Sequence, residues 1–138
     1  MLHLVPLLLA LLASHVHASD IAIENAWIAE APPVSRVHAG YFTLRNAGDK
    51  AVTLKAVHSD SYDNIEMHLS IEQDGVSSMQ WLQQIEIPAG EDFSFAPGAY
   101  HLMLFRPHKP LKQGDSVKLQ FEFADGQRVD TTAIVKKR

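Results

Sequence analysis

The side chains of this sequence that could bind a metal ion are histidines and methionines in its central part. Beyond the first residue, methionine occurs only at positions 67, 79 and 103. His68 follows Met67 directly, and His101 lies two residues before Met103. If residues 98–105 form a strand, His101 and Met103 lie on the same face, roughly 7 Å apart along the backbone. An imidazole nitrogen and a thioether sulfur on such neighbours can bind one ion.

A hairpin turn is predicted within residues 64–87. Asp74-Gly75 is a preferred dipeptide for the two-residue turn of a β-hairpin. A turn at this position pairs Gln73 with Val76 and therefore sets the register of both strands.

The register of this hairpin predicts a second His/Met pair. Counting outward from the turn, Ser70 faces Met79 and His68 faces Trp81. His68 and Met79 then lie diagonally across one face of the hairpin. Met67 lies on the opposite, core-like face, so we expect it to be a packing residue.

The types of these side chains indicate the metal. Thioether sulfur is a soft, neutral donor and imidazole is a borderline one, so the set favours Cu(I) over Zn(II), Ni(II), Mg(II) or Ca(II). The sequence has no cysteine, which excludes zinc–thiolate sites, iron–sulfur clusters and blue-copper centres. We expect one Cu(I) per chain, bound less tightly in acid because protons compete for the imidazoles.

Signatures of catalysis are absent from the sequence. It contains no G-x-S-x-G elbow, P-loop, H-E-x-x-H helix or dinucleotide-binding glycine run. His58 lies beside Ser59 and Asp60, but neighbours in a loop are weak grounds for a catalytic triad. We therefore predict that the protein is not an enzyme. A metal-free β-sandwich that serves adhesion or assembly is the alternative from another class.

Other aromatic and imidazole side chains have simpler interpretations than metal binding. His38 alternates with the core side of a strand, and His58 and His108 lie in polar loops. Trp81, beside His68, could shield the ion with its ring, although a partly exposed packing residue is the simpler interpretation.

The elements that carry these residues are predicted to be strands. Ser116 to Phe123 shows strict alternation of apolar and polar residues, and no segment after residue 19 has helical periodicity. Eight other strands are expected: Ile21 to Ile28, Val37 to Arg45, Ala51 to Val57, Asn64 to Ile71, Ser77 to Ile87, Asp92 to Phe95, Tyr100 to Phe105 and Arg128 to Val135. This number of short strands is typical of an all-β Greek-key sandwich or barrel.

The length, the net charge and the N-terminal residues limit the classes of protein to which this chain can belong. The chain has 138 residues, 46% of them apolar, which suits one globular domain. Residues 1–18 carry no charged side chain and contain an apolar run before Val16-His17-Ala18, which predicts a signal peptide followed by a single domain at 19–138. A net charge of −4 offers no basic surface for nucleic acid or anionic lipid.

The spacing of the four candidate ligands is more specific than any one of them. His68, Met79, His101 and Met103 are separated by ten, twenty-one and one residues. This pattern resembles the signature His-x10-Met-x21-His-x-Met of the periplasmic copper chaperones called PCu(A)C. The resemblance spans about residues 20–136. It includes these flanking segments: Ala26-Trp27-Ile28, Tyr41-Phe42-Thr43-Leu44, Ile87-Pro88-Ala89-Gly90 and Pro110-Leu111-Lys112.

The resemblance implies a fold, a cargo and a partner. The fold would be a cupredoxin-like Greek-key β-sandwich that binds Cu(I) through the same four residues. Members of that family take up copper in the periplasm and help to load cytochrome c oxidase, particularly its CuA centre. The expected acceptor is therefore membrane-anchored, either oxidase subunit II or another assembly chaperone.

The role of the site, the oligomeric state and the number of copper sites are the remaining expectations. Copper storage or detoxification at the same site is the alternative to delivery. We expect a monomer that neither inserts into a membrane nor binds nucleic acid. The Met- and His-rich tail of some family members is not found at residues 134–138, so a second, Cu(II)-type site is not expected.

Overall fold

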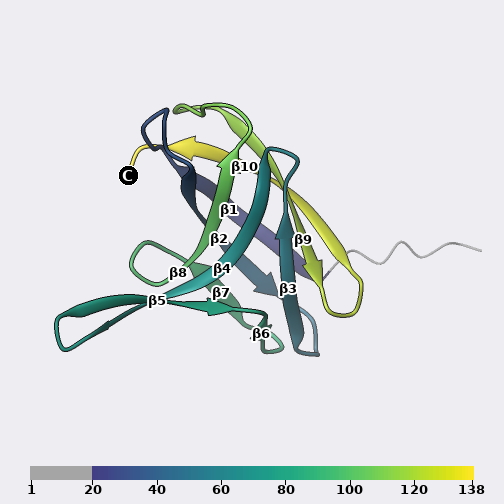
Figure 1. Cartoon of the computed structure of the whole chain (residues 1–138). Helices are drawn as coiled ribbons and strands as arrows, with labels where there is room; N and C mark the ends of the chain where they lie inside the picture. The colour runs from purple at the N-terminus through teal and green to yellow at the C-terminus, as the bar shows by residue number, and fades with distance from the viewer. Residues whose placement is uncertain (1–19) are drawn as a thin grey trace, which may run out of the picture.

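The computed structural model describes residues 20–138, which form ten β-strands and no helix (Figure 1). No helix of the described residues could therefore cross a membrane. The predicted signal peptide at 1–18 lies outside the described residues. The strands are β1 (Ile21–Ala29), β2 (Val37–Asn46), β3 (Val52–His58), β4 (Tyr62–Gln73), β5 (Val76–Leu82), β6 (Ile85–Ile87), β7 (Asp92–Phe95), β8 (Tyr100–Pro107), β9 (Ser116–Phe123) and β10 (Arg128–Lys136).

The strands form one continuous hydrogen-bonded order, β5-β4-β8-β2-β1-β10-β9-β3-β6, with β7 paired to β2. The pairs are antiparallel except β1 with β10, which run parallel. A bulge lies in β1 between Glu24 and Trp27, where Asn25 adopts a φ of 52°. Bulges increase the local twist, and this twist helps the sheet to fold over on itself (Figure 1).

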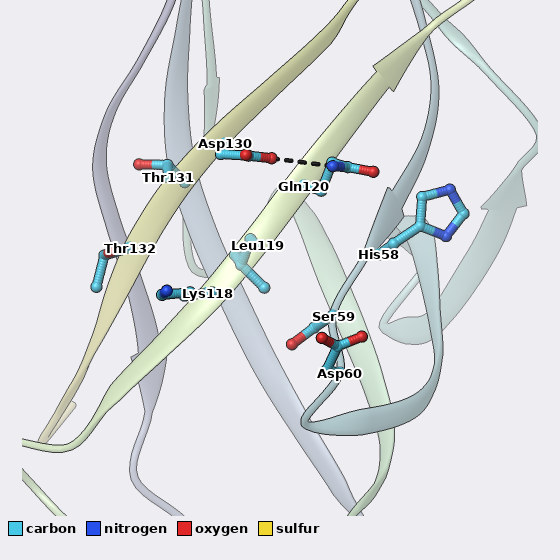
Figure 2. Close-up of a pocket in the computed structure, with 9 residues that line it drawn as sticks. All are labelled: His58, Ser59, Asp60, Lys118, Leu119, Gln120, Asp130, Thr131 and Thr132. Atoms are coloured by element: carbon cyan, nitrogen blue, oxygen red, sulfur yellow. Dashed lines mark hydrogen bonds between the residues drawn. The ribbon is translucent and has the colours of Figure 1, made fainter.

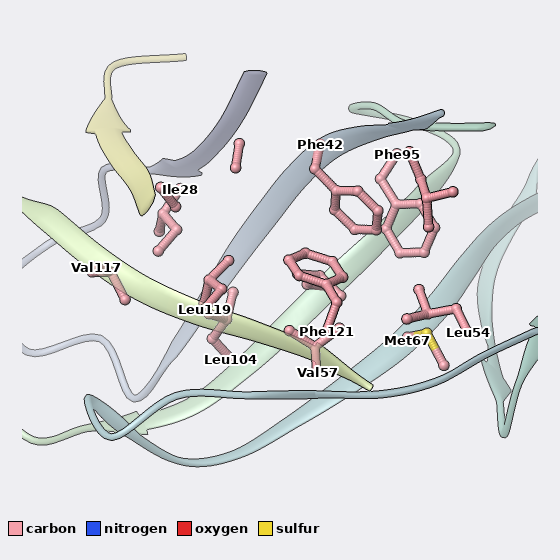
Figure 3. Close-up of a cluster of buried hydrophobic side chains, with 14 of the residues drawn as sticks. Ile28, Phe42, Leu54, Val57, Met67, Phe95, Leu104, Val117, Leu119 and Phe121 are labelled. Atoms are coloured by element: carbon pink, nitrogen blue, oxygen red, sulfur yellow. The ribbon is translucent and has the colours of Figure 1, made fainter. Parts of the chain in front are cut away.

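The hydrophobic core lies between the two layers of this folded sheet. Phe42 on β2 and Phe121 on β9 belong to strands that are not neighbours, yet their ring centroids are 4.7 Å apart. Leu104 and Val117 are also fully buried in this cluster (Figure 3). Full burial of each such side chain contributes about 1.5–3 kcal/mol. The prediction of an all-β, cupredoxin-like sandwich is confirmed.

The alternation that predicted the strands has a direct counterpart in burial. Along β9, Val117, Leu119, Phe121 and Phe123 are at most 2% exposed, and Ser116 and Lys118 are exposed. Met67 on β4 is also buried in the core, at 4% exposure, as the hairpin register predicted (Figure 3).

The prediction of a single strand at Ser77 to Ile87 is wrong. The structure divides this segment into β5, which pairs with β4, and β6, which pairs with β3. The reason is burial, since Ile85 and Ile87 enter the core whereas residues 76–81 are exposed. The two strands, consecutive in the chain, therefore lie at opposite ends of the strand order.

The turn between β4 and β5 has the predicted geometry. Asp74 and Gly75 have φ values of 53° and 76°, and two consecutive positive φ angles are the mark of a type I′ hairpin turn. Gln73 pairs with Val76 as predicted. β4 lies between β5 and β8 in the sheet and pairs with both, which brings the two candidate His/Met pairs together.

Candidate metal centre

The two candidate histidines lie directly opposite each other on neighbouring strands. His68 of β4 and His101 of β8 are partners in the antiparallel register, so their side chains leave the sheet on the same face. Their ring centroids are 5.8 Å apart and the ring planes are inclined by 31°. The structure therefore brings together two imidazoles that are 33 positions apart in the chain.

The two candidate methionines flank this histidine pair. Met79 of β5 lies opposite Ser70, two residues beyond His68 on β4. Met103 follows His101 on β8 and lies opposite Glu66. The thioethers thus lie on opposite sides of the row that His68 and His101 form.

The exposure of these four residues differs widely. Met79 is 61% exposed, on a hairpin that projects from the body of the molecule (Figure 1), whereas His101 is buried at 6%. Met79, His101 and Met103 line one open groove of about 550 Å³. His68 is not among the residues that line it, and its side chain, 13% exposed, lies beneath the surface.

Hydrogen bonds to each imidazole define which nitrogen carries the proton. His68 Nε2 lies 2.8 Å from Glu66 Oε2, and His101 Nδ1 lies 3.2 Å from the carbonyl oxygen of Ala99. A carboxylate and a carbonyl can only accept, so these two nitrogens donate. The proton-free nitrogens are His68 Nδ1 and His101 Nε2, and both are buried without a hydrogen-bond partner.

This donor set fits a soft metal ion. Two neutral imidazole nitrogens with free lone pairs and two neutral thioethers lie on one face of the sheet, a combination that Cu(I) prefers. In the described part of the chain, no group of three or more His, Cys, Asp or Glu side chains is placed to hold a metal. A metal bound by the His68–His101 pair would therefore need donors of another type, which the methionines can supply.

The other histidines of residues 20–138 have partners within the protein. His38 is buried, with Nδ1 2.8 Å from the hydroxyl oxygen of Tyr62, and burial lowers the pKa of His38. His108 Nε2 donates to Asp63 Oδ1 over 2.8 Å. Hydrogen bonds, first from Arg106 and then from His108, lower the pKa of Asp63.

A second groove is lined by all three residues of the rejected triad, His58, Ser59 and Asp60 (Figure 2). His58 does not turn toward Ser59 or Asp60, which lie apart from its ring in Figure 2. Its Nε2 instead lies 2.8 Å from Glu122 Oε2. This hydrogen bond is the main cause of the lowered pKa of Glu122. The imidazole of His58 is therefore paired with a carboxylate and not with Ser59.

Two residues lie next to His68 without being candidate ligands: Trp81, which the sequence placed there, and Glu66. Trp81 is 57% exposed and lies directly opposite His68, as the hairpin count predicted. Glu66 was not among the residues predicted from the sequence, although its position two residues before His68 on a strand places both side chains on one face. That spacing was the available signal.

The fold defines a cupredoxin-like β-sandwich, and the imidazoles and thioethers on its outer face make it a candidate metal-binding member of that class. The chain belongs to the LpqE-like family, whose model matches residues 21–135. Its domain is of the PCuAC type, as the spacing of the four candidate ligands predicted.

Individual relatives agree with this assignment. The protein Lxx21020 of Leifsonia xyli subsp. xyli (strain CTCB07), described as a lipoprotein, is 26% identical over 120 residues, 86% of this chain and 71% of its own length. The copper-bound PCuAC domain from PmoF2 superposes with a TM-score of 0.74 at 20% identity, over 88% of this chain and 97% of that domain. The Cu(I) form of DR1885 from Deinococcus radiodurans superposes with a TM-score of 0.69 at 26% identity, over 91% and 84%.

Proposed function

We propose that this protein is an exported metallochaperone that binds one Cu(I) ion through His68, Met79, His101 and Met103. One observation carries the proposal: two buried imidazole nitrogens lie without partners on directly opposed residues. A buried polar atom without a partner costs about 1–3 kcal/mol, and native structures rarely contain one without a reason. A metal ion would satisfy both nitrogens at once.

The identity of the cargo follows from donor chemistry and from the relatives. All four donors are neutral, and two are thioethers, which favours Cu(I) over harder divalent ions. A structure of DR1885, 26% identical to this chain, is of its Cu(I) form. These two independent supports point to the same ion.

The exposure of the site suits a carrier that releases its cargo. Met79 is 61% exposed on the edge strand β5, and the groove beside His101 and Met103 is open to solvent. An incoming ligand can therefore reach the ion and replace the thioethers in turn. Without a cysteine in the sequence, a blue-copper electron-transfer role is chemically excluded. We infer a binding protein rather than an enzyme.

The destination of the copper is the finer part of the proposal. The predicted signal peptide and a family described in terms of lipoproteins support export, and we assign the protein to the periplasm. The acceptor implied by the sequence resemblance is the CuA centre of cytochrome c oxidase, reached through subunit II or another assembly chaperone. A single site per chain suits delivery better than storage, where a protein gains from binding many ions.

A competition titration tests the copper site. The protein is titrated with Cu(I) against a chromophoric chelator under anaerobic conditions, as wild type and as the Met79→Leu/Met103→Leu double variant. Leucine conserves the volume of methionine, so the free energy of unfolding should change by less than about 1.5 kcal/mol. We expect one Cu(I) per wild-type chain and about 100-fold weaker binding by the variant, about 1.4 kcal/mol per thioether.

Met67→Leu is the matched control. Met67 adjoins His68 in the chain but lies in the core at 4% exposure, so this variant should keep wild-type copper affinity. Equal affinity in the wild type and the double variant would remove the thioethers from the site and overturn the proposal.

A gene deletion separates delivery from storage. Loss of cytochrome c oxidase activity at unchanged copper tolerance supports delivery to the oxidase. Loss of copper tolerance with normal oxidase activity supports storage or detoxification and contradicts the assigned acceptor.

A further inference from the structure

Glu66 contacts the candidate site without being one of its predicted ligands. Its Oε2 lies 2.8 Å from His68 Nε2, and its Oε1 lies 3.4 Å from the side-chain nitrogen of Asn64. Among the described residues, no lysine or arginine forms an ion pair with Glu66. The carboxylate is thus directed at the histidine rather than at a lysine or arginine.

The position of Glu66 in the sheet explains this contact. Glu66 and His68 are alternate residues of β4, so their side chains leave the same face. Met103 lies directly opposite Glu66 on β8. The side chain of Glu66 is 33% exposed and that of His68 is 13% exposed. The hydrogen bond is therefore partly buried.

The contact decides which nitrogen of His68 can bind a metal. An ionised carboxylate only accepts hydrogen bonds, so Nε2 of His68 carries the proton and Nδ1 keeps the lone pair. His101 has the opposite arrangement, because Ala99 O accepts from its Nδ1 and leaves Nε2 free. The two free nitrogens are the two partnerless buried atoms of the site.

We propose that Glu66 is a positioning residue of the copper site. It holds His68 in the Nε2–H tautomer, so that His68 presents Nδ1 to the ion while His101 presents Nε2. Carboxylates that hold a ligating histidine in this way orient the ring and make its free nitrogen a stronger donor. The carboxylate itself is a hard donor that Cu(I) disfavours. This assignment rests on the proposed function for the ion, but the tautomers are a property of the metal-free protein.

The first test is made without metal. Long-range ¹H–¹⁵N correlation spectra of the ¹⁵N-labelled protein at neutral pH distinguish protonated from proton-free ring nitrogens. We expect His68 to carry its proton on Nε2 and His101 on Nδ1. In Glu66→Ala, His68 should populate both tautomers and His101 should be unchanged. If His68 in the wild type is protonated on Nδ1, or if Glu66→Ala leaves its tautomer unchanged, the proposal is overturned.

The second test measures Cu(I) affinity in three variants. Glu66→Ala should bind Cu(I) 10- to 100-fold more weakly, the usual loss for such a partner. Glu66→Gln retains an accepting oxygen and should recover most of the affinity. Glu72→Ala removes an equal charge from an exposed residue of the same strand face and should bind as the wild type does. Equal losses in Glu66→Ala and Glu72→Ala would assign the effect to net charge and contradict positioning.

The two proposals fail in different ways. A wild-type protein that binds no Cu(I) overturns the proposed function and the ligand assignment with it, whatever the spectra show. A wild-type protein that binds Cu(I), with Glu66→Ala binding equally well, overturns the role of Glu66 and leaves the copper function standing.

Discussion

Replacing His101 by leucine should remove copper binding without destabilising the metal-free protein. His101 is buried at 6% exposure, and its Nε2 has no partner. Leucine removes this atom, which relieves a cost of about 1–3 kcal/mol. It also deletes the shared hydrogen bond of Nδ1 with Ala99 O at 3.2 Å and Ser70 Oγ at 3.5 Å, which contributes about 0.5–1.5 kcal/mol. Ala99 O keeps a second donor, the backbone N–H of Ser70 at 3.1 Å.

The two effects do not cancel. Taking the middle of each range, about 2 kcal/mol is gained and about 1 kcal/mol is lost, so the His101→Leu variant should be more stable by about 1 kcal/mol. For a domain of this size that corresponds to a rise in Tm of about 3–6 °C. A residue retained for metal binding would thus lower the stability of the apoprotein.

The assay is urea unfolding with a Cu(I) chelator present, comparing midpoints at equal m-values. Leu102→Ala is the control from the same strand, because Leu102 faces the core at 0% exposure and its truncation should cost about 2–5 kcal/mol. With free Cu(I) at 100 times its Kd, the wild type should gain about 2.7 kcal/mol, whereas His101→Leu should gain nothing. The order of stability then reverses.

One result would refute this reasoning. If His101→Leu loses more than about 1 kcal/mol in the metal-free protein at an unchanged m-value, Nε2 is not an unsatisfied atom in solution. The support that the buried nitrogens give to a metal site would then be lost.

Two further predictions concern buried polar residues that are not candidate ligands. Burial lowers the pKa of His38 in the folded protein. As the pH falls below about 6.5, the unfolded chain therefore takes up the proton before the folded one does, and the free energy of unfolding decreases. Urea unfolding between pH 7.5 and 5.5 should show that the difference in unfolding free energy between the wild type and His38→Gln shrinks as the pH falls. A difference that does not change with pH would contradict this. Asn46 is 2% exposed and donates to the carbonyls of Lys50, Ile87 and Pro88. Asn46→Ala should cost at least about 2 kcal/mol of unfolding free energy, whereas exposed Gln84→Ala should change it by less than about 0.5 kcal/mol.

Local geometry made much of the fold predictable. The alternation in Ser116 to Phe123 is visible in the sequence because the side chains of a strand alternate between two faces. For the same reason, Met103 could be placed with His101. The turn at Asp74-Gly75 set the register of β4 and β5, so Met67 was correctly assigned to the core and Met79 to the face of His68.

The boundary between β5 and β6 was not predictable in the same way. Residues 77–87 contain no Gly, Pro, Asn or Asp that would signal a turn, and their division depends on which partner strand each half pairs with. Val76–Leu82 adds to the edge of β4, whereas Ile85–Ile87 packs into the core beside β3. The position of the break is set by tertiary contacts, namely pairing with β4 for the first half and packing beside β3 for the second.

The sequence by itself determined the strands, the hairpin register and which side chains share a face, because these depend on residues close together in the chain. The tertiary structure alone decided that His68 lies opposite His101 and that two imidazole nitrogens are buried without partners. These features depend on the pairing of β4 with β8, which no local turn connects. The register of β4 against β8 is set by Met67, Leu102 and Leu104, which pack in the core on the opposite face from the histidines.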